Sequence, residues 1–289
     1  MKLRLGVRGM MWLTLVIMMW GIISCRTQEE KCLEEVLSLP LANKEELQKV
    51  LDHYKDDSLK YQAVCFLIRN MPFHAGYEGN ALKHYYQYFD IYAQGKLGPH
   101  EVIDSLKENS FSVSQLKRIE DIANIDSSLL VQNVDWAFKV WREQPWGKNV
   151  SFDNFCEFVL PYRLGDEPLG FWREDIYKRY NPILDSIRLL PQAQDPLVAA
   201  KVLMDSLVVE QSHFTGLFPA GPHLGPSVVS WRAGSCREFA DLVVYVMRAL
   251  GIPCGTDYMA MRGDNNVPHF WNFTLDKDGK TYITEFPDP

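Results

Sequence analysis

Cysteine is scarce in this sequence, with six residues in 289, so the chain is not a disulfide-stapled scaffold. No segment recurs at a fixed period of about 20 to 50 residues, which excludes a solenoid. Positive charge is also limited: 30 Lys and Arg stand against 37 Asp and Glu, for a formal net charge of −7. No nucleic-acid partner is expected, because phosphate binding needs a concentrated basic face.

The composition is instead that of a folded protein. Hydrophobic residues make up 47% of the chain, aromatic residues 12% and charged residues 23%. A chain this apolar buries enough surface to fold, which excludes an intrinsically disordered tail. At roughly 150 residues per domain, the length predicts one or two globular domains.

The N-terminus has the pattern of an export signal. Residues 2–8 carry three positive charges, and residues 10–23 are apolar or glycine apart from one threonine. This run of roughly 14 residues is shorter than the ~20 that a membrane-spanning helix needs, and it fits the apolar part of a signal peptide. A permanent signal anchor is the alternative interpretation.

The end of this segment, Ile22-Ile23-Ser24-Cys25, resembles the bacterial lipobox. The resemblance implies that residues 1–25 are a lipoprotein signal peptide and that Cys25 becomes the lipidated first residue of the mature protein. We therefore expect a protein of the cell envelope, lipid-anchored outside the cytoplasm at the outer membrane or cell surface. The membrane is then one of its partners.

Residues 26–147 are predicted to form a helical N-terminal region. Apolar residues recur along it at spacings of three and four, as at Leu59, Ala63, Phe66 and Leu67. Pro and Gly interrupt this pattern and separate several amphipathic helices.

Residues 148–289 are predicted to form a second domain. Helices near 152–159 and 196–209 precede a Gly- and Pro-rich loop at 216–226, and loops of that length are commonly functional. A helix over residues 235–250 follows, and it is apolar on nearly all sides, so it must be buried.

Three strand-like segments follow the buried helix, at residues 255–261, 269–275 and 280–286. The last two are joined by Asp276-Lys277-Asp278-Gly279, a hairpin turn signal. The fold class is therefore predicted to be α+β, with a buried helix packed on an antiparallel sheet. Three strands are few beside the usual four to six or so, and we expect the chain to stop partway through this domain.

Cys236 falls in the first turn of the buried helix. The positive end of the helix dipole and the free N–H groups there favour a thiolate. His269 begins a strand expected to pack beside the helix, and a thiolate with a neighbouring imidazole is an arrangement for nucleophilic attack on a carbonyl. A carboxylate is then needed to orient the imidazole. In a tight hairpin Glu285 falls across from or diagonal to His269, and Asp288 lies slightly beyond.

The other cysteines are predicted to be structural. Cys65, Cys156 and Cys254 lie among apolar neighbours, and buried packing is the usual role of such residues. A metal site built from Cys236, Cys254 and His269 is not expected, since their spacings match none of the short paired-ligand patterns. His213 precedes the 216–226 loop and His223 lies in it; they could line a substrate groove, but single loop histidines are usually solvated, and this is the prediction for both.

Several of these segments resemble the transglutaminase-like superfamily. The resemblance covers about residues 230–289 and rests on Gly234-Ser235-Cys236 opening a helix, Leu250-Gly251-Ile252-Pro253 closing it, and His269-Phe270-Trp271-Asn272. In addition, residues 66–72 and 160–163 resemble the helical leader of transglutaminase-like lipoproteins of Bacteroides-type bacteria. The family implies a papain-like core that places Cys, His and Asp in that order.

The resemblance implies acyl-transfer chemistry on amide bonds of a peptide or protein substrate. Cys236 would attack a carbonyl to form a thioester, with its own backbone N–H as one donor to the oxyanion. Trp231 is the nearest candidate for a second donor. Water as the acceptor would give a peptidase or amidase, and an amine would give an acyltransferase. No metal or organic cofactor is required.

The third catalytic residue departs from the family pattern. Glu285 has the position expected from the strand register, whereas Asp288 keeps the usual residue type but arrives three residues later. Because of this departure and the short sheet, a second hypothesis is a non-catalytic cell-surface binding or scaffold module that retains the fold.

Overall fold

The computed structural model describes residues 28–106, 111–218, 220–263 and 266–286. The predicted signal peptide with Cys25 lies outside these residues, as does Asp288. The chain divides into two compact units, residues 1–42 and residues 43–289. Across the described ranges, no helix combines the length and the apolar character that crossing a membrane requires.

The described part of the first unit is dominated by one helix, α2, Gln28–Leu37. Acidic side chains in its first turn, Glu29 and Glu30, favour the helix because they lie at the positive end of its dipole. The helix also carries Cys32, a partly exposed free thiol.

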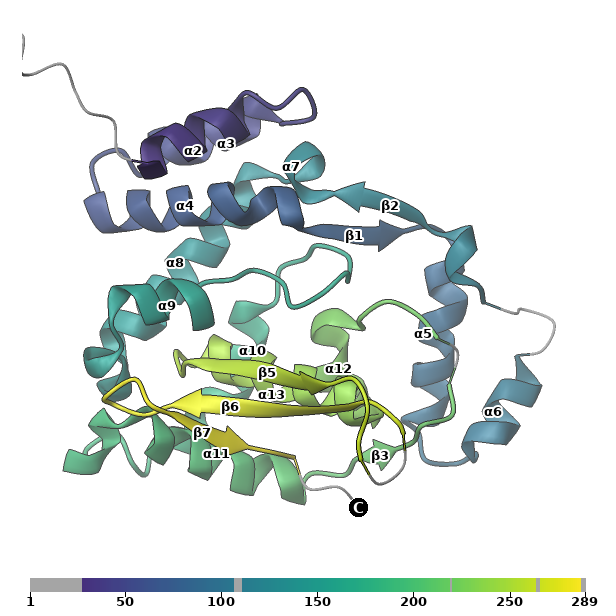
Figure 1. Ribbon diagram of the computed structural model, residues 1–289. Coiled ribbons are helices and arrows are strands. Elements are labelled where there is room, and N and C mark those ends of the chain that lie inside the picture. The colour runs from purple at the N-terminus through teal and green to yellow at the C-terminus, as the bar shows by residue number, and fades with distance from the viewer. Residues whose placement is uncertain (1–27, 107–110, 219, 264–265, 287–289) are drawn as a thin grey trace, which may run out of the picture. The chain divides into compact units, whose positions relative to one another are not determined.

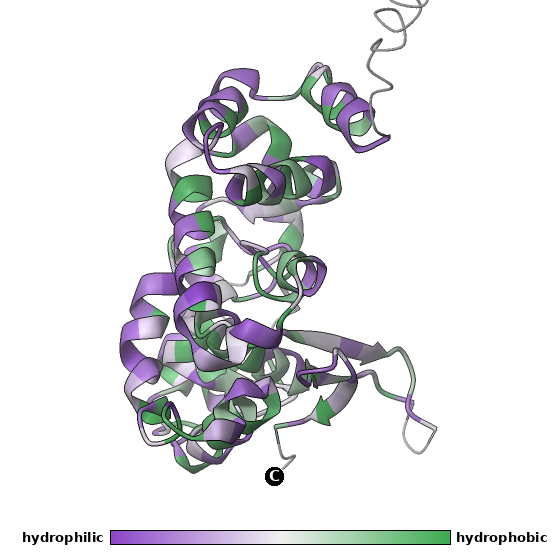
Figure 2. Ribbon diagram, turned by 90° about the vertical axis from the view of Figure 1, so that its left-hand side faces the viewer, coloured by the Kyte–Doolittle hydropathy of each residue, from purple (hydrophilic) through white to green (hydrophobic). Residues whose placement is uncertain are grey.

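The second unit combines many helices with short strands, which agrees with the predicted α+β class (Figure 1). Hydrophilic and hydrophobic residues alternate along most of these helices, as expected for helices with one buried face (Figure 2). The α-helices are α3 Lys44–His53, α4 Ser58–Asn70, α5 Ala81–Tyr92, α6 Pro99–Ser105, α7 Asp121–Asn124, α8 Ser127–Glu143, α9 Phe152–Phe158, α10 Arg173–Tyr180, α11 Pro196–Val209, α12 Val228–Trp231 and α13 Cys236–Ala249.

The described strands form three small sheets. The first two are pairs: β1 Ala75–Glu78 with β2 Lys117–Glu120, antiparallel, and β3 His213–Phe214 with β4 Ala233–Gly234, parallel. The third is antiparallel in the order β5-β6-β7, from Cys254–Met259, His269–Leu275 and Thr281–Thr284. This third sheet confirms the three predicted strands. The two pairs were not predicted, because their strands are too short for an alternating pattern and their partners are distant in sequence.

Helix α13 confirms the predicted buried helix. All of its residues from Glu238 onward are buried. It contacts β5 and β6 as well as α8, α10, α11 and α12, so neighbours surround it and the apolar residues on all its sides have packing partners.

The predicted domain boundary between residues 147 and 148 lies inside the second unit. Trp146, just before it, is fully buried in the hydrophobic core that contains α13. Its indole N–H donates to the backbone oxygen of Leu250 at 2.8 Å. One core therefore spans this point, and the expected change from a helical domain to a mixed domain is not a break between compact units.

Buried charges connect this core to the β1 and α7 segment. The guanidinium of Arg163 donates to the carboxylate of Asp121 at 2.8 Å and to the backbone oxygen of Ala75 at 2.8 Å. Glu167 accepts from the hydroxyl of Tyr245 on α13 at 2.7 Å. Segments far apart in the sequence are thus joined by hydrogen-bonded charged groups.

His223 is paired with a buried carboxylate and its own side chain is 24% exposed, so the prediction of a simply solvated histidine was wrong. Its Nδ1 lies 2.7 Å from Oδ2 of Asp241, whose side chain is 5% exposed. Burial alone would lower the pKa of His223, but the charge and hydrogen bond of Asp241 outweigh it and raise the pKa to about 9. The pairing could not be read from sequence, because Asp241 looked like one polar residue on an otherwise apolar helix.

This ion pair predicts a pH-dependent stability. Because the pKa is higher in the folded than in the unfolded chain, the contribution of His223 is complete below about pH 6.5 and is lost as the pH rises through about 9. Between pH 6 and pH 9.5, the free energy of unfolding of the wild type is expected to fall by ~3 kcal/mol more than that of His223→Gln. Urea denaturation at the two pH values measures this difference. The same pH dependence in both proteins would contradict this assignment.

Candidate active site

The start of α13 holds Cys236 in a defined position. Ser235 is the N-cap: its hydroxyl oxygen accepts from the backbone N–H of Arg237, and the Glu238 carboxylate accepts from the Ser235 N–H at 2.9 Å. This reciprocal capping box makes Cys236 the first residue of the helix. Gly234 has a φ of +137°, and a Cβ there would lie 2.5 Å from the Glu238 side chain, so glycine suits this entry to the helix.

The charge of Glu238 near the thiol is neutralised locally. Glu238 is fully buried, and the guanidinium of Arg237 lies 2.7 Å from its carboxylate. The N–H of Cys236 belongs to the first turn, where backbone donors have no acceptor within the helix. The positive end of the helix dipole thus remains available to a negative charge beside Cys236.

His269 is positioned by the antiparallel sheet. It pairs with Met259 of β5, and on the other side of β6 Asn272 pairs with Thr284 of β7. Continuing that register places Glu285 opposite Trp271 and diagonal to His269, on the same face of the sheet.

The carboxylate of Glu285 contacts the imidazole of His269, at the position that the sequence register predicts. His269 Nε2 lies 2.7 Å from Glu285 Oε1. A carboxylate only accepts hydrogen bonds, so Nε2 is the donor of this bond, and in a neutral ring the free lone pair is then on Nδ1. The His269 ring also stacks on Trp271, with ring centroids 5.7 Å apart.

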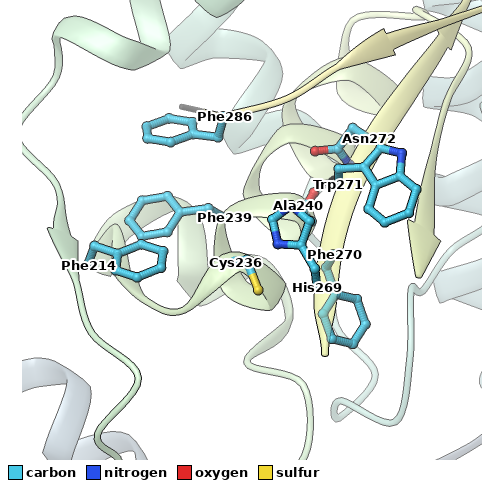
Figure 3. A pocket seen from close by; sticks show the side chains of 9 residues that line it. All are labelled: Phe214, Cys236, Phe239, Ala240, His269, Phe270, Trp271, Asn272 and Phe286. Atoms are coloured by element: carbon cyan, nitrogen blue, oxygen red, sulfur yellow. Dashed lines mark hydrogen bonds between the residues drawn. The ribbon is translucent and has the colours of Figure 1, made fainter. Parts of the chain in front are cut away.

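Cys236 and His269 meet at one pocket. Figure 3 shows that Cys236 of α13 and His269 of β6 both line this pocket. Both residues line two cavities: a small one of about 10 Å³ and an open groove of about 560 Å³. The larger of the two has room for part of a ligand next to the pair.

Asn272 ties the histidine strand to the cysteine helix. Its side chain is 1% exposed and reaches the pocket (Figure 3), and its Nδ2 donates to the backbone oxygen of Ala240 at 3.0 Å. Ala240 lies one helical turn after Cys236, and Asn272 lies three residues after His269. This bond therefore holds the two elements at a fixed separation.

Replacing Asn272 with alanine is expected to destabilise the protein by ~1–3 kcal/mol, since the Ala240 carbonyl loses a buried donor. Chemical denaturation measures this loss. The control is Asn149→Ala, which removes an Asn bond to the backbone oxygen of Gln194 that is exposed. Equal stabilities for the two variants would show that the buried bond does not secure the site.

Trp231 is placed away from the cysteine. It lies on α12 and does not line either cavity at Cys236. Its indole N–H donates to the carboxylate of Asp90, and its ring stacks on Phe89 with centroids 5.7 Å apart. This geometry gives no support to Trp231 as an oxyanion donor.

The remaining cysteines of the second unit are buried, as the sequence predicts. Cys65 lies in α4, and burial raises the pKa of Cys156 and of Cys254 to about 12. Thiols of this kind are unreactive near neutral pH. Within the described part of the chain, no three His, Cys, Asp or Glu residues are grouped so that they could hold a metal ion.

The aromatic lining of the site is a feature that the sequence did not reveal. Phe214 contributes to both cavities, and Phe239 and Phe286 line the small one. The Phe214 and Phe286 rings each stack on Phe239, with centroids 5.9 and 4.7 Å away. Phe214 precedes the cysteine by 22 positions and has no local motif, so only the folded chain shows its role.

Comparison with known proteins gave no match, whether to protein-family models, to curated proteins or to solved structures.

Proposed function

We propose that this chain is a cysteine enzyme of transglutaminase-like architecture that acts on amide bonds of peptides or proteins through a thioester. The observation that carries the proposal is the 2.7 Å contact between His269 Nε2 and Glu285, in a pocket that His269 shares with Cys236 at a helix N-terminus. The proposal includes export and lipid anchoring at Cys25 in the cell envelope, for which the support is the sequence pattern of residues 1–25.

The acylation step uses the three residues in turn. His269 Nδ1 takes the proton of the Cys236 thiol, and the sulfur attacks the carbonyl carbon of the substrate. The negative charge that develops on the carbonyl oxygen is stabilised by the Cys236 backbone N–H. The imidazolium, held by the Glu285 carboxylate, then gives its proton to the leaving amine and a thioester remains.

The second step releases the acyl group. Water or an amine gives a proton to His269 and attacks the thioester carbonyl, and the proton returns to the sulfur of Cys236. Water yields a carboxylic acid and an amine yields a new amide. Both outcomes need only the same three side chains.

The thioester itself provides the test. Brief exposure to the activated ester p-nitrophenyl acetate, followed by acid quench and peptide mass mapping, is expected to find an acetyl group on Cys236. Cys32 is the other partly exposed thiol among the described residues, so the experiment uses a Cys32→Ser background. Acetyl transfer that is unaffected by Cys236→Ala would reject the proposal and favour a non-catalytic binding module.

A further inference from the structure

The groove at Cys236 is large and mainly apolar. Its volume of about 560 Å³ falls within the ~300–1,000 Å³ typical of ligand sites. Cys236 and His269 lie along it, so a molecule bound there is next to the nucleophile. The other lining residues are Phe214, Gly216, Phe218, Ser235, Arg262, Val267, Pro268 and Phe270.

The apolar walls are open to solvent where a ligand would enter. Phe214 is 40% exposed and Val267 is 48% exposed, on opposite sides of the cysteine in sequence. Leu217 and Met261, which flank the lining segments, are also exposed. A contiguous group of exposed apolar side chains is unusual on a protein surface and commonly marks a binding site.

The described residues that line the groove carry little charge. Arg262 is among them, and none of them is acidic. A cationic side chain of a substrate would find no counter-charge among these described residues, and a primary amide would lose its hydrogen bonds with water against aromatic walls. An aromatic or large aliphatic side chain instead gains from leaving water.

We infer that the acyl donor of this enzyme carries an aromatic or large aliphatic side chain beside the reactive carbonyl, and that the groove at Cys236 receives it. The inference rests on the proposed function and adds a substrate class to it. The reaction breaks the C–N bond after this residue and forms the C–S bond to Cys236. The nitrogen leaves with the proton from His269, and water or an amine later cleaves the thioester.

Matched electrophiles test the preference. Acetylated phenylalanine, alanine, lysine and glutamate chloromethyl ketones each alkylate a thiol with loss of chloride, and differ in the side chain beside the carbonyl. We expect the phenylalanine reagent to label Cys236 about 10- to 100-fold faster than the alanine reagent, and faster than the two charged ones. Equal rates, or a faster charged reagent, would overturn the inference.

Gly216 allows the groove to be filled. A Cβ at this position would meet no atom within 4 Å, and the same holds for Gly170, which lies in a different cavity. Gly216→Phe is expected to slow the labelling of Cys236 by the phenylalanine reagent at least about tenfold. Gly170→Phe is expected to leave this rate unchanged. If both variants behave alike, the side chain is not bound in this groove.

A second variant covers the case in which Gly216→Phe does not fold. Phe218→Ala removes one aromatic wall and is expected to lower the ratio of phenylalanine to alanine labelling several-fold. An unchanged ratio in a folded variant would overturn the inference.

Iodoacetamide separates this inference from the proposed function, because it is too small to need the groove. If iodoacetamide labels Cys236 in a His269-dependent manner but the ketones show no preference, only the substrate class is wrong. If the dependence on His269 is absent as well, the catalytic assignment has failed.

Discussion

His269→Ala is expected to slow the alkylation of Cys236 by iodoacetamide at pH 7 about 100-fold. In the proposed mechanism the imidazole takes the thiol proton, and a positioned base of this kind contributes ~10²–10⁴-fold to proton transfer. Without it, thiolate formation depends on the helix N-terminus alone. Labelling in the Cys32→Ser background, followed by peptide mapping, measures the rate.

A substitution of Glu285 is expected to have a smaller effect on the labelling rate than His269→Ala. Glu285→Gln keeps the shape of the side chain but removes the charge that holds the imidazole at 2.7 Å. Its labelling rate is expected to fall between that of wild type and that of His269→Ala. The control is His100→Ala, which changes an exposed histidine on α6.

Two results would contradict the catalytic assignment of His269 and Cys236. Labelling of Cys236 at the same rate in wild type and in His269→Ala would remove the base from the mechanism. Labelling of Cys254 as fast as Cys236 in the folded protein would remove Cys236 as the nucleophile, because Cys254 is fully buried and a buried thiol is unreactive near pH 7.

Asp121→Ala is expected to destabilise the protein by ~3–5 kcal/mol, because it leaves a buried guanidinium without its counter-charge. The Arg163 and Asp121 side chains are 3% and 2% exposed, and the Tyr162 hydroxyl donates to the same carboxylate at 2.8 Å. Urea denaturation at pH 7 measures the change. The active site is not directly altered, so a folded fraction should keep its labelling of Cys236.

The neighbouring residue provides a matched control. Glu120 forms an ion pair with Arg118 at 2.9 Å, but their side chains are 37% and 56% exposed. Glu120→Ala is therefore expected to cost no more than ~1 kcal/mol. A double change, Asp121→Leu with Arg163→Met, removes both charges and should recover much of the stability lost in Asp121→Ala. If Asp121→Ala and Glu120→Ala lower the free energy of unfolding by the same amount, the buried pair is not a major source of stability.

Local patterns account for the features predicted correctly. The apolar run of α13, the serine that caps it and the turn between β6 and β7 all lie within a short stretch of chain. Hydrophobic periodicity and turn chemistry act over such distances. The position of Glu285 beside His269 follows from them, because a tight turn fixes the register of the two strands that it joins.

Other features depend on contacts between distant residues. Trp231 precedes Cys236 by five positions, which made it a candidate oxyanion donor, yet its N–H bonds to Asp90 on α5. His223 lies in a loop-like stretch but pairs with the buried Asp241 of α13. The sequence prediction for each residue rests on its near neighbours in the chain. The actual partners, Asp90 and Asp241, are not among those neighbours.

By itself, the sequence determined a capped, buried helix with Cys236 at its first turn and a hairpin that brings Glu285 to His269, because short-range periodicity, capping and turn geometry are local properties. Only the tertiary structure decided that one core spans the expected domain boundary, that aromatic side chains from distant segments form the groove, and that buried charged groups within the second unit join segments far apart in sequence. These features arise when the chain brings together residues far apart in sequence, which no local pattern encodes.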